Sequence, residues 1–378
     1  MYDQEFSSEQ FVIDGDAKRR ACNSIITGDA VMSPAGSGNV RVSFVDNITS
    51  SYKSVSVIRL ETESGKNITL NAESVIPVSI PNTSFSTTHL SPDSHYVYLM
   101  YKREYGYRIG TTKNPRGRIN GEHADRMWLI GVYNNATEAL YYENLLCFSY
   151  GVPTMTFVDH ISADKRKVVA RITQSWIDRL FNELDTEGSA TELCKDIGVI
   201  LSHLPHIVPQ SYGKRVSVYL KFFNTPIRNG KSKRPSHTLS VETSDKRNAQ
   251  LIEENSTMNR TKSKKDGSRF RMSTIDFKKV SRQAFSLCNI LDGSLVIRPK
   301  IISKKSMSGF YSLQPIGCHA ANILEGFMLP VLVSGHIELE RIVSIQRFPE
   351  KIREMCSLRT DNSPIVCVNN IFVFSDLV

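Results

Sequence analysis

The stretch "YVYLMYKREYGYRIGTTKNPRGR", residues 96–118, places five tyrosines and six basic side chains around two short apolar runs. Both halves are typical of strands, and the polar residues between them suit a tight turn. The segment "NPRGRINGEHADR" is typical of a helix or an irregular connection, and "MWLIGVY" of a third strand. The stretch therefore predicts a β-hairpin that opens a small α/β module.

The strongest helix pattern in the chain follows directly, in "NNATEALYYENLLCFSYG". Asn135 or Thr137 can cap its start, apolar residues recur at helical spacing, and Gly151 can end it. Strands and helix together predict a compact α/β module over residues 95–160.

The rest of the chain alternates between strand-rich and polar sequence. After a polar flank at 1–21, strand patterns fill 22–86 and return over 285–378. Between the module and the second strand-rich part, 161–284 combines amphipathic helical sequence with basic, Ser- and Asn-rich sequence. We find no internal repeat. This layout predicts a multidomain α+β fold in which the two chain ends form one all-β domain around an insertion.

Composition gives broad limits on function. The 378 residues suit two or three domains, and a net charge of +9 favours polyanionic partners. The seven cysteines are odd in number and form no CxxC, which argues against a disulfide framework or a zinc ribbon. The sequence shows no signal peptide and no apolar run near the ~20 residues of a membrane helix. We expect a soluble protein of a reducing, cytoplasmic compartment in a bacterial or phage setting, without membrane contact.

The central stretch resembles the GIY-YIG nuclease module. Tyr96-Val97-Tyr98 stands at the first motif of that family, and Arg108-Ile109-Gly110, preceded by Tyr107, stands at the second. An Arg two helical turns later corresponds to Arg118, and a Glu on the following helix to Glu143. The resemblance covers about 60 residues and implies metal-dependent cleavage of double-stranded DNA.

The resemblance also implies roles for individual side chains. Tyr98 would act as general base or orient the attacking water, and Arg118 would stabilise the charge on the phosphate. Glu143 would hold one Mg²⁺ or Mn²⁺. Tyr107 and His123 would assist.

Three positions leave the assignment open. Tyr96 replaces the first glycine of the family pattern, Arg108 replaces the second tyrosine, and Arg116 competes with Arg118 for the arginine position. The alternative is that the tyrosines are strand and core residues and that the charged side chains are merely solvated.

The two strand-rich ends resemble the intein (Hint) domain. Cys22, in "CNSIITGDAVMSPAG", stands where the family has its nucleophilic cysteine. Asn71 and Ser74 occupy the places of a Thr-x-x-His motif, and the chain ends on Phe374-Ser375-Asp376 in place of His-Asn. The resemblance implies a horseshoe-shaped all-β domain from which protein splicing has been lost, with residual processing at Cys22 as an alternative.

Two further features bear on partners. Segments such as "LFNELDT" resemble inteins of superfamily 1 helicases, which would make residues 1–21 a relic of a helicase host protein. "SPAGSGNV" lacks the Gly-Lys-Ser/Thr of a P-loop, so we expect a Gly-rich turn and no nucleotide cofactor.

Basic residues near the module and in the polar region are candidate contacts to DNA phosphates. These candidates are Lys113, Arg116, Lys262, Lys264, Lys265, Arg269 and Arg271.

The leading hypothesis is an intein-derived protein with a GIY-YIG homing-endonuclease-like module. The alternatives are a catalytically decayed DNA-binding remnant and a protein that retains processing at Cys22.

Overall fold

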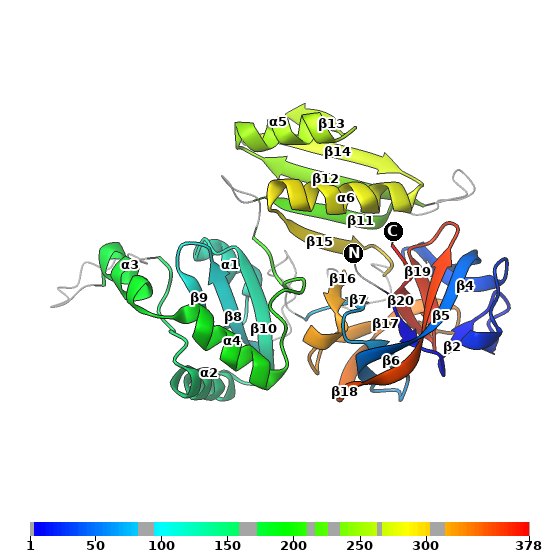
Figure 1. Ribbon diagram of the computed structural model, residues 1–378, viewed down its shortest axis with the longest axis horizontal. Helices are drawn as coiled ribbons and strands as arrows, with labels where there is room; N and C mark the ends of the chain where they lie inside the picture. The colour runs from blue at the N-terminus through cyan, green and yellow to red at the C-terminus, as the bar shows by residue number, and fades with distance from the viewer. Residues whose placement is uncertain are drawn as a thin grey trace. The chain divides into compact units, whose positions relative to one another are not determined.

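The computed structural model describes residues 4–81, 94–158, 172–209, 216–225, 235–262, 267–302 and 314–377, with Thr225 and Lys262 described by their backbone alone. These residues form two compact units (Figure 1). The central unit takes the described residues between 90 and 210. The terminal unit takes those before 82 and after 210, so both chain ends belong to it.

A ten-stranded sheet dominates the terminal unit, in the order β3-β2-β19-β20-β17-β18-β1-β6-β5-β4. Its strands from the start of the chain are β1 (Phe6–Ser7), β2 (Phe11–Ile13), β3 (Arg19–Ala21), β4 (Ala30–Gly36), β5 (Asn39–Thr62) and β6 (Asn67–Asn71). Its strands from the end of the chain are β17 (Met328–Val333), β18 (His336–Thr360), β19 (Ile365–Val368) and β20 (Ile371–Phe374). The short strands β7 (Val75–Val78) and β16 (Ile316–His319) pair with each other beside it. Both chain ends are therefore mostly β, as predicted.

The described part of the first 21 residues contributes β1, β2 and β3 to this sheet. β1 pairs with β18 and β6, and β2 pairs with β3 and β19. The segment expected as a flank is thus built into the terminal unit.

The two longest strands, β5 and β18, pair with each other along most of their length. Their register runs from Ile342 opposite Thr62 to Thr360 opposite Val45. Several irregularities in this register let both strands bend. The pair joins residues from opposite ends of the sequence and so closes the terminal unit.

The two halves of the terminal unit repeat one local architecture. A 3-10 turn at Cys22–Ser24 precedes β4, and another at Ala320–Asn322 precedes β17. Gly28 and Gly326 then take nearly the same positive φ, 92° and 87°. Each donates its N–H to the following long strand, at the carbonyls of Val45 (2.8 Å) and Ile342 (2.9 Å) respectively.

The hairpins that follow repeat as well. Ser37-Gly38 links β4 to β5 and Ser334-Gly335 links β17 to β18, with positive φ at all four residues. Two positive φ values in succession are the geometry of a type I′ turn, which suits the twist of paired strands. The first of these is the Gly-rich turn expected in "SPAGSGNV". The expectation of no internal repeat was wrong, because the two halves share turn positions and hydrogen bonds although few of their residues are identical.

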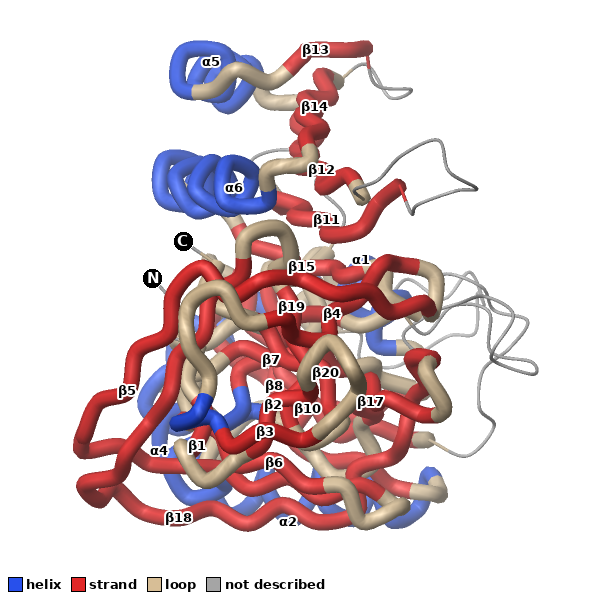
Figure 2. Tube along the Cα trace, turned by 90° about the vertical axis from the view of Figure 1, so that its right-hand side faces the viewer, coloured by secondary structure: helices blue, strands red, loops and turns tan. Residues whose placement is uncertain are grey.

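The described residues between 216 and 302 contain a separate five-stranded sheet, in the order β13-β14-β12-β11-β15. Its elements are β11 (Ser217–Thr225), β12 (Ser236–Thr243), α5 (Lys246–Asn255), β13 (Asn259–Lys262), β14 (Ser268–Thr274), α6 (Phe277–Leu291) and β15 (Ser294–Pro299). Figure 2 shows α5 and α6 on one side of this sheet. Leu239, Val241 and Phe270 are buried on that face. The sheet extends beyond the region 161–284, which was expected to be helical and basic, because strand sequence is interspersed there with polar residues.

The central unit has a three-stranded antiparallel sheet, β10-β8-β9. Its elements are β8 (His95–Lys102), β9 (Gly106–Thr112), α1 (Pro115–Gly121), β10 (Arg126–Tyr133), α2 (Ala136–Tyr150), α3 (Gln174–Glu183) and α4 (Thr186–Ile197). Asn114 caps α1 and Asn135 caps α2, each accepting a backbone N–H three residues on. Gly151 ends α2 in the left-handed conformation, as its place in the sequence predicted.

One face of this sheet supports the core of the central unit. Leu99, Ile109 and Trp128 pack there against residues of α2 and α4 such as Ala139 and Leu193. The other face is therefore left for the polar side chains described below. No helix in the described part of the chain is long and apolar enough to cross a membrane.

Gly28→Ala is expected to destabilise the terminal unit by about 1–2 kcal/mol, because an L side chain is strained at φ +92°. A Cβ at Gly28 would meet no atom within 4 Å, so only the backbone strain is tested. Urea unfolding of the full chain measures the effect.

Gly121→Ala is the matched control, since its Cβ also meets nothing and its φ is not positive. It should leave stability unchanged or slightly improved. Equal destabilisation in both variants would contradict the strain assigned to Gly28.

Candidate active site

The site starts from Tyr98, whose side chain is fully buried on β8. Tyr98 lies opposite Gly110 on β9. A Cβ at position 110 would overlap the Tyr98 phenol, so the close approach of the two strands here needs glycine. This explains the glycine of the "RIG" motif by the space that the tyrosine takes.

Arg108 is two residues before Gly110 and faces the same side of the sheet. Its Nη1 lies 3.2 Å from the Tyr98 hydroxyl and 2.7 Å from Glu122 Oε1. Its Nη2 donates to the carbonyl of Thr154 at 2.6 Å. The residue that departs from the family pattern is thus fixed at the centre of the cluster and covers Tyr98.

Glu122 connects the cluster. It is fully buried at the end of α1 and accepts from Arg108, from Arg118 Nη1 (3.4 Å) and from the N–H of Phe157 (2.8 Å). Sequence reasoning missed Glu122. The spacing of four residues from Arg118, within a predicted helix, was the pattern that could have found it.

Arg118 and Glu143 lie on different helices and both influence Tyr98 through their charges. Arg118 lies on α1 with 37% of its side chain exposed, and it joins the cluster through Glu122. Glu143 lies half-buried on α2, and its charge acts on the Tyr98 hydroxyl together with those of Arg108, Arg118 and Glu122. Of the residues chosen from the sequence, Arg118 is thus linked to Tyr98 through Glu122 and Arg108, whereas Glu143 is related to Tyr98 by its charge alone.

Electrostatics set the state of the Tyr98 hydroxyl. Burial is the largest influence and raises its pKa above the ordinary value. Arg108 and Arg118 oppose this rise, whereas Glu122 and Glu143 add to it. Tyr98 is therefore protonated at neutral pH.

Tyr107 and His123 do not join this cluster as expected. Tyr107 points to the other face of the hairpin, where its ring lies 4.9 Å from Tyr101 and 6.3 Å from Trp128. Burial there raises the pKa of Tyr107 to about 12. Since neighbouring strand residues face opposite sides, Tyr107 and Arg108 cannot both face Tyr98. His123 is exposed in the turn after α1, at φ +54°.

Glu143 is the candidate metal ligand. It forms no hydrogen bond or ion pair with any residue that the structure describes, which leaves its carboxylate oxygens available. The described residues contain no group of three or more metal-ligating side chains. A single carboxylate still suits Mg²⁺, which keeps several waters in its coordination shell.

Cys22 lies in a different environment from the one its predicted role requires. It is fully buried, and a hydrogen bond with Cys356 together with burial raises the pKa of its thiol. A thiol held protonated is a poor nucleophile. Its backbone N–H donates to Gln10, whereas Ser375 is bound to Ser363 and Pro364.

Asn71 and Ser74, which stand in the Thr-x-x-His positions, have structural contacts. The Asn71 amide donates to Glu5 Oε2 at 2.9 Å. The Ser74 hydroxyl binds both the N–H (2.8 Å) and the carbonyl (2.9 Å) of Glu5. These two side chains fix the start of the chain, and they offer no acid–base group.

The candidate DNA contacts lie in three places. Lys113 is exposed before α1, and Arg116 is half-buried on α1. Arg269 and Arg271 are exposed on β14, and Arg269 pairs with Glu242. Lys262 lies in β13, and Lys264 and Lys265 fall outside the described residues.

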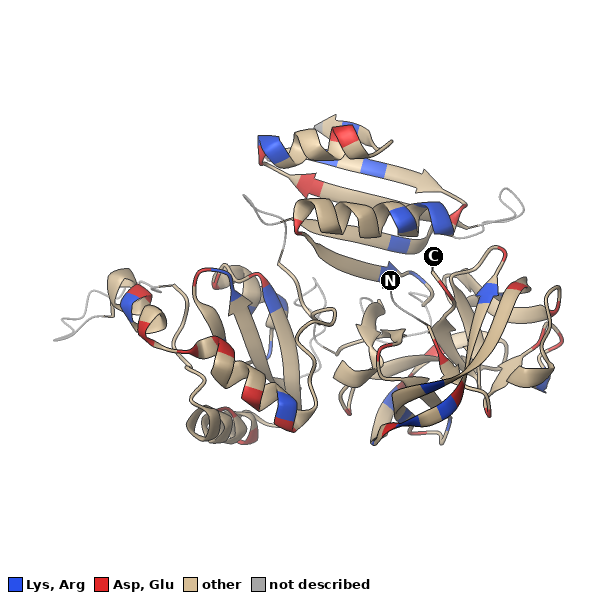
Figure 3. Cartoon of the chain, viewed as in Figure 1, with Lys and Arg blue, Asp and Glu red and all other residues tan. Residues whose placement is uncertain are grey.

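The sheet face opposite α5 and α6 carries further basic residues that the sequence did not reveal. Lys221 on β11 faces the same side as Arg271, and Arg298 on β15 lies opposite Lys221 in register. Burial, and then the positive charges of Arg298, Lys300 and Arg271, lower the pKa of Lys221. Figure 3 marks basic residues in blue along β11 and β14. We call Lys221, Arg269, Arg271 and Arg298 the basic sheet face.

No protein-family model matches the sequence, and no curated protein matches it. Among solved structures, the chain is similar to a crystal structure of the gp41-1 intein, with 8% identity over 98% of this chain and 99% of that chain. The TM-score is 0.27, which is too low to assign a fold.

Glu122→Ala should destabilise the central unit by about 3–5 kcal/mol, because it leaves Arg108 buried without its partner. Glu143→Ala should change stability by less than about 0.5 kcal/mol, since Glu143 has no partner among the described residues. Urea unfolding of both variants provides the comparison. Similar destabilisation by both would show that Glu122 does not hold the cluster together.

Proposed function

We propose that the chain is an intein-derived, homing-endonuclease-like protein whose central unit cleaves double-stranded DNA. The observation that supports this most is the hydrogen-bonded cluster that links Tyr98 on β8 to Arg118 on α1 through Arg108 and Glu122, together with the charge of Glu143 on α2 that acts on the Tyr98 hydroxyl. Hydrolysis of a phosphodiester needs an oriented water, a cation at the phosphate and a carboxylate for a metal. These three side chains supply one group of each kind.

Each residue has a defined part in the proposed mechanism. Arg118, the more exposed arginine, would bind the phosphate oxygens and stabilise the charge that develops on them. Tyr98, protonated at neutral pH, would orient the attacking water by hydrogen bonding and would not remove its proton. Glu143 would hold Mg²⁺, which when bound neutralises charge on the leaving oxygen. Arg108 would fix the Tyr98 hydroxyl through its 3.2 Å contact.

A catalytically decayed DNA-binding remnant is the second candidate. The complete burial of Tyr98 beneath Arg108 favours it, because water reaches the hydroxyl only if Arg108 moves. In this alternative the Arg108–Glu122 pair serves stability alone.

We propose duplex DNA as the partner in both cases. The basic sheet face gathers four cationic side chains, of which Arg269 pairs with Glu242. Cations gathered on one sheet face suit the phosphate backbone, which gives binding that depends on salt and only weakly on sequence.

We also propose that the β part of the terminal unit is a Hint-related scaffold that no longer splices. Its duplicated halves and the pairing of β5 with β18 support the relationship. The protonated Cys22 thiol and the structural contacts of Asn71 and Ser74 support the loss of splicing.

The nuclease proposal predicts nicking of supercoiled plasmid in Mg²⁺ by the full chain. Glu143→Ala and Arg118→Ala should each slow cleavage by about 100-fold or more, because each removes a group that acts on the transition state. Gel electrophoresis of the plasmid over time provides the rate.

His123→Ala is the control, since His123 lies outside the cluster, and it should cut at the rate of the unaltered chain. Equal cutting by unaltered chain and Glu143→Ala would reject the mechanism. Salt-sensitive DNA retention without cutting would favour the remnant.

Replacing Lys221, Arg269 and Arg271 with alanine should lower the affinity for DNA. It should also make that affinity depend less on salt concentration. The slope of log K against log salt concentration should fall by roughly 0.9 for each phosphate that the protein no longer neutralises. Fluorescence anisotropy at several salt concentrations measures this slope. An unchanged slope would place the DNA-binding surface elsewhere on the chain.

A further inference from the structure

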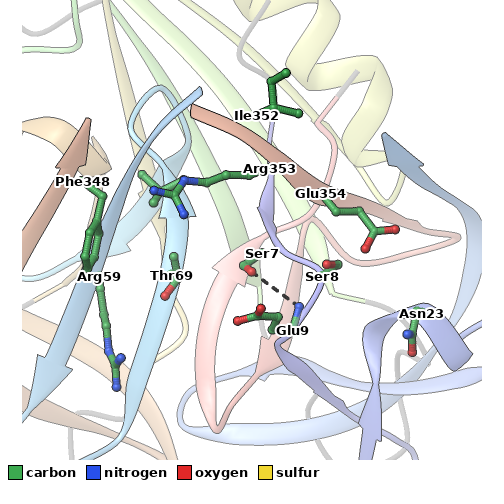
Figure 4. A pocket seen from close by; sticks show the side chains of 11 residues that line it. Ser7, Ser8, Glu9, Asn23, Arg59, Thr69, Phe348, Ile352, Arg353 and Glu354 are labelled. Atoms are coloured by element: carbon green, nitrogen blue, oxygen red, sulfur yellow. Dashed lines mark hydrogen bonds between the residues drawn. The ribbon is translucent and has the colours of Figure 1, made fainter. Parts of the chain in front are cut away.

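The terminal unit contains a cavity of about 570 Å³ that none of the proposed activities uses. Residues of β1, β5, β6 and β18 line it, together with Asn23 from the 3-10 turn after β3 (Figure 4). Its volume falls within the range of small-molecule sites. Every residue that lines it lies in the described part of the terminal unit.

Two arginines place positive charge along the wall of the cavity. Arg59 comes from β5 and Arg353 from β18, and neither forms an ion pair with any described residue. The Nε of Arg353 is buried and has no hydrogen-bond acceptor among the described residues. By contrast, Lys53, which lies opposite Arg353 in the strand register, is neutralised by Glu5. An arginine without an anionic partner favours an oxyanion beside its guanidinium, because charge-assisted hydrogen bonds to carboxylate or phosphate oxygens are strong.

Neutral groups add hydrogen-bonding capacity. The hydroxyls of Ser8 and Thr69 and the amide of Asn23 also line the cavity. A hydroxyl or amide donates readily to a carboxylate or phosphate oxygen. The arginines therefore have donors that can share one bound anion with them.

An apolar wall lies beside the arginines. The Phe348 ring is 37% exposed, and the Arg353 guanidinium lies 5.8 Å from its centroid. Val57 is buried opposite Phe348 in the strand register and extends this wall. A flat ring can stack on such a surface next to a guanidinium.

Two acidic residues limit what the cavity accepts. Figure 4 shows the Glu354 carboxylate directed away from the Arg353 guanidinium, and the Ser50 hydroxyl donates to it at 2.9 Å. Glu9 lines the same cavity. Their charges disfavour ligands with several anionic groups, so a single oxyanion suits the site best.

We propose that this cavity binds a small molecule in which a flat ring carries one oxyanion, either phosphate or carboxylate. The oxyanion lies beside Arg353, Arg59 adds positive charge to the same cavity, and the ring lies against Phe348. This site is separate from the cluster around Tyr98, so it stands or falls independently of the nuclease proposal.

The test uses three ring compounds with the full-length chain: phenyl phosphate, benzoate and uncharged benzamide. Isothermal titration and ligand-observed NMR measure binding up to about 10 mM, because fragments of this size bind weakly. At least one of the two anions should bind, and benzamide should bind at least tenfold more weakly. Preference for phenyl phosphate assigns a phosphate ligand, and preference for benzoate a carboxylate ligand.

Arg353→Gln and Arg59→Gln should each weaken binding of the preferred anion by about tenfold or more. Arg59 is exposed, so its variant folds even if that of Arg353 does not. Arg341→Gln, an exposed arginine on the same strand β18, should bind normally, and all three should cut plasmid at the unaltered rate. Absence of binding by both anions, equal binding of benzamide, or equal affinity of Arg59→Gln and Arg341→Gln would overturn the proposal.

Discussion

The pairing of β5 with β18 is the constraint on which the terminal unit depends. Strands from opposite ends of the sequence meet there over most of their length, from Ile342 opposite Thr62 to Thr360 opposite Val45. Closing so long a loop costs entropy, but that cost grows only slowly with loop length. The hydrogen bonds of two long strands offset it. This is why the chain accommodates the central unit and the five-stranded sheet between its two β halves.

The central unit depends on a different interaction, the buried pair of Arg108 and Glu122. An isolated buried charge is unfavourable, so these two side chains hold each other in place at 2.7 Å. Glu122 also receives Arg118 and the N–H of Phe157, which links α1 to the segment after α2. The same carboxylate that stabilises the fold therefore positions the arginine proposed to bind phosphate. Stability and any chemistry at Tyr98 are coupled through one residue.

Prediction from the sequence succeeded for features that depend on residues close together in the chain. The hairpin around Tyr98, the caps of α2 and the glycine-rich turn at Ser37-Gly38 all follow from local propensity. Glu143 and Arg118 were chosen through a resemblance; the structure links Arg118 to Tyr98 through Glu122 and Arg108, and the role of Glu143 stays a prediction. The prediction that Tyr107 assists Tyr98 was wrong, because neighbouring strand residues face opposite sides of a sheet and Arg108 already faces Tyr98. Glu122, the basic sheet face and the repeat were missed because each depends on pairing between distant segments, which periodicity within one segment does not encode.

The repeated halves of the terminal unit have a consequence for its assembly. Each half presents a long strand to the other, and the turns that lead into these strands are alike at Gly28 and Gly326. A half from a second molecule offers the same partner surface as the half that follows in the same chain. Such an exchange of equivalent segments produces a domain-swapped dimer, in which every native hydrogen bond is kept and only the chain of origin changes. If the halves exchanged in this way, protein concentration and refolding conditions would set the balance between monomer and swapped dimer.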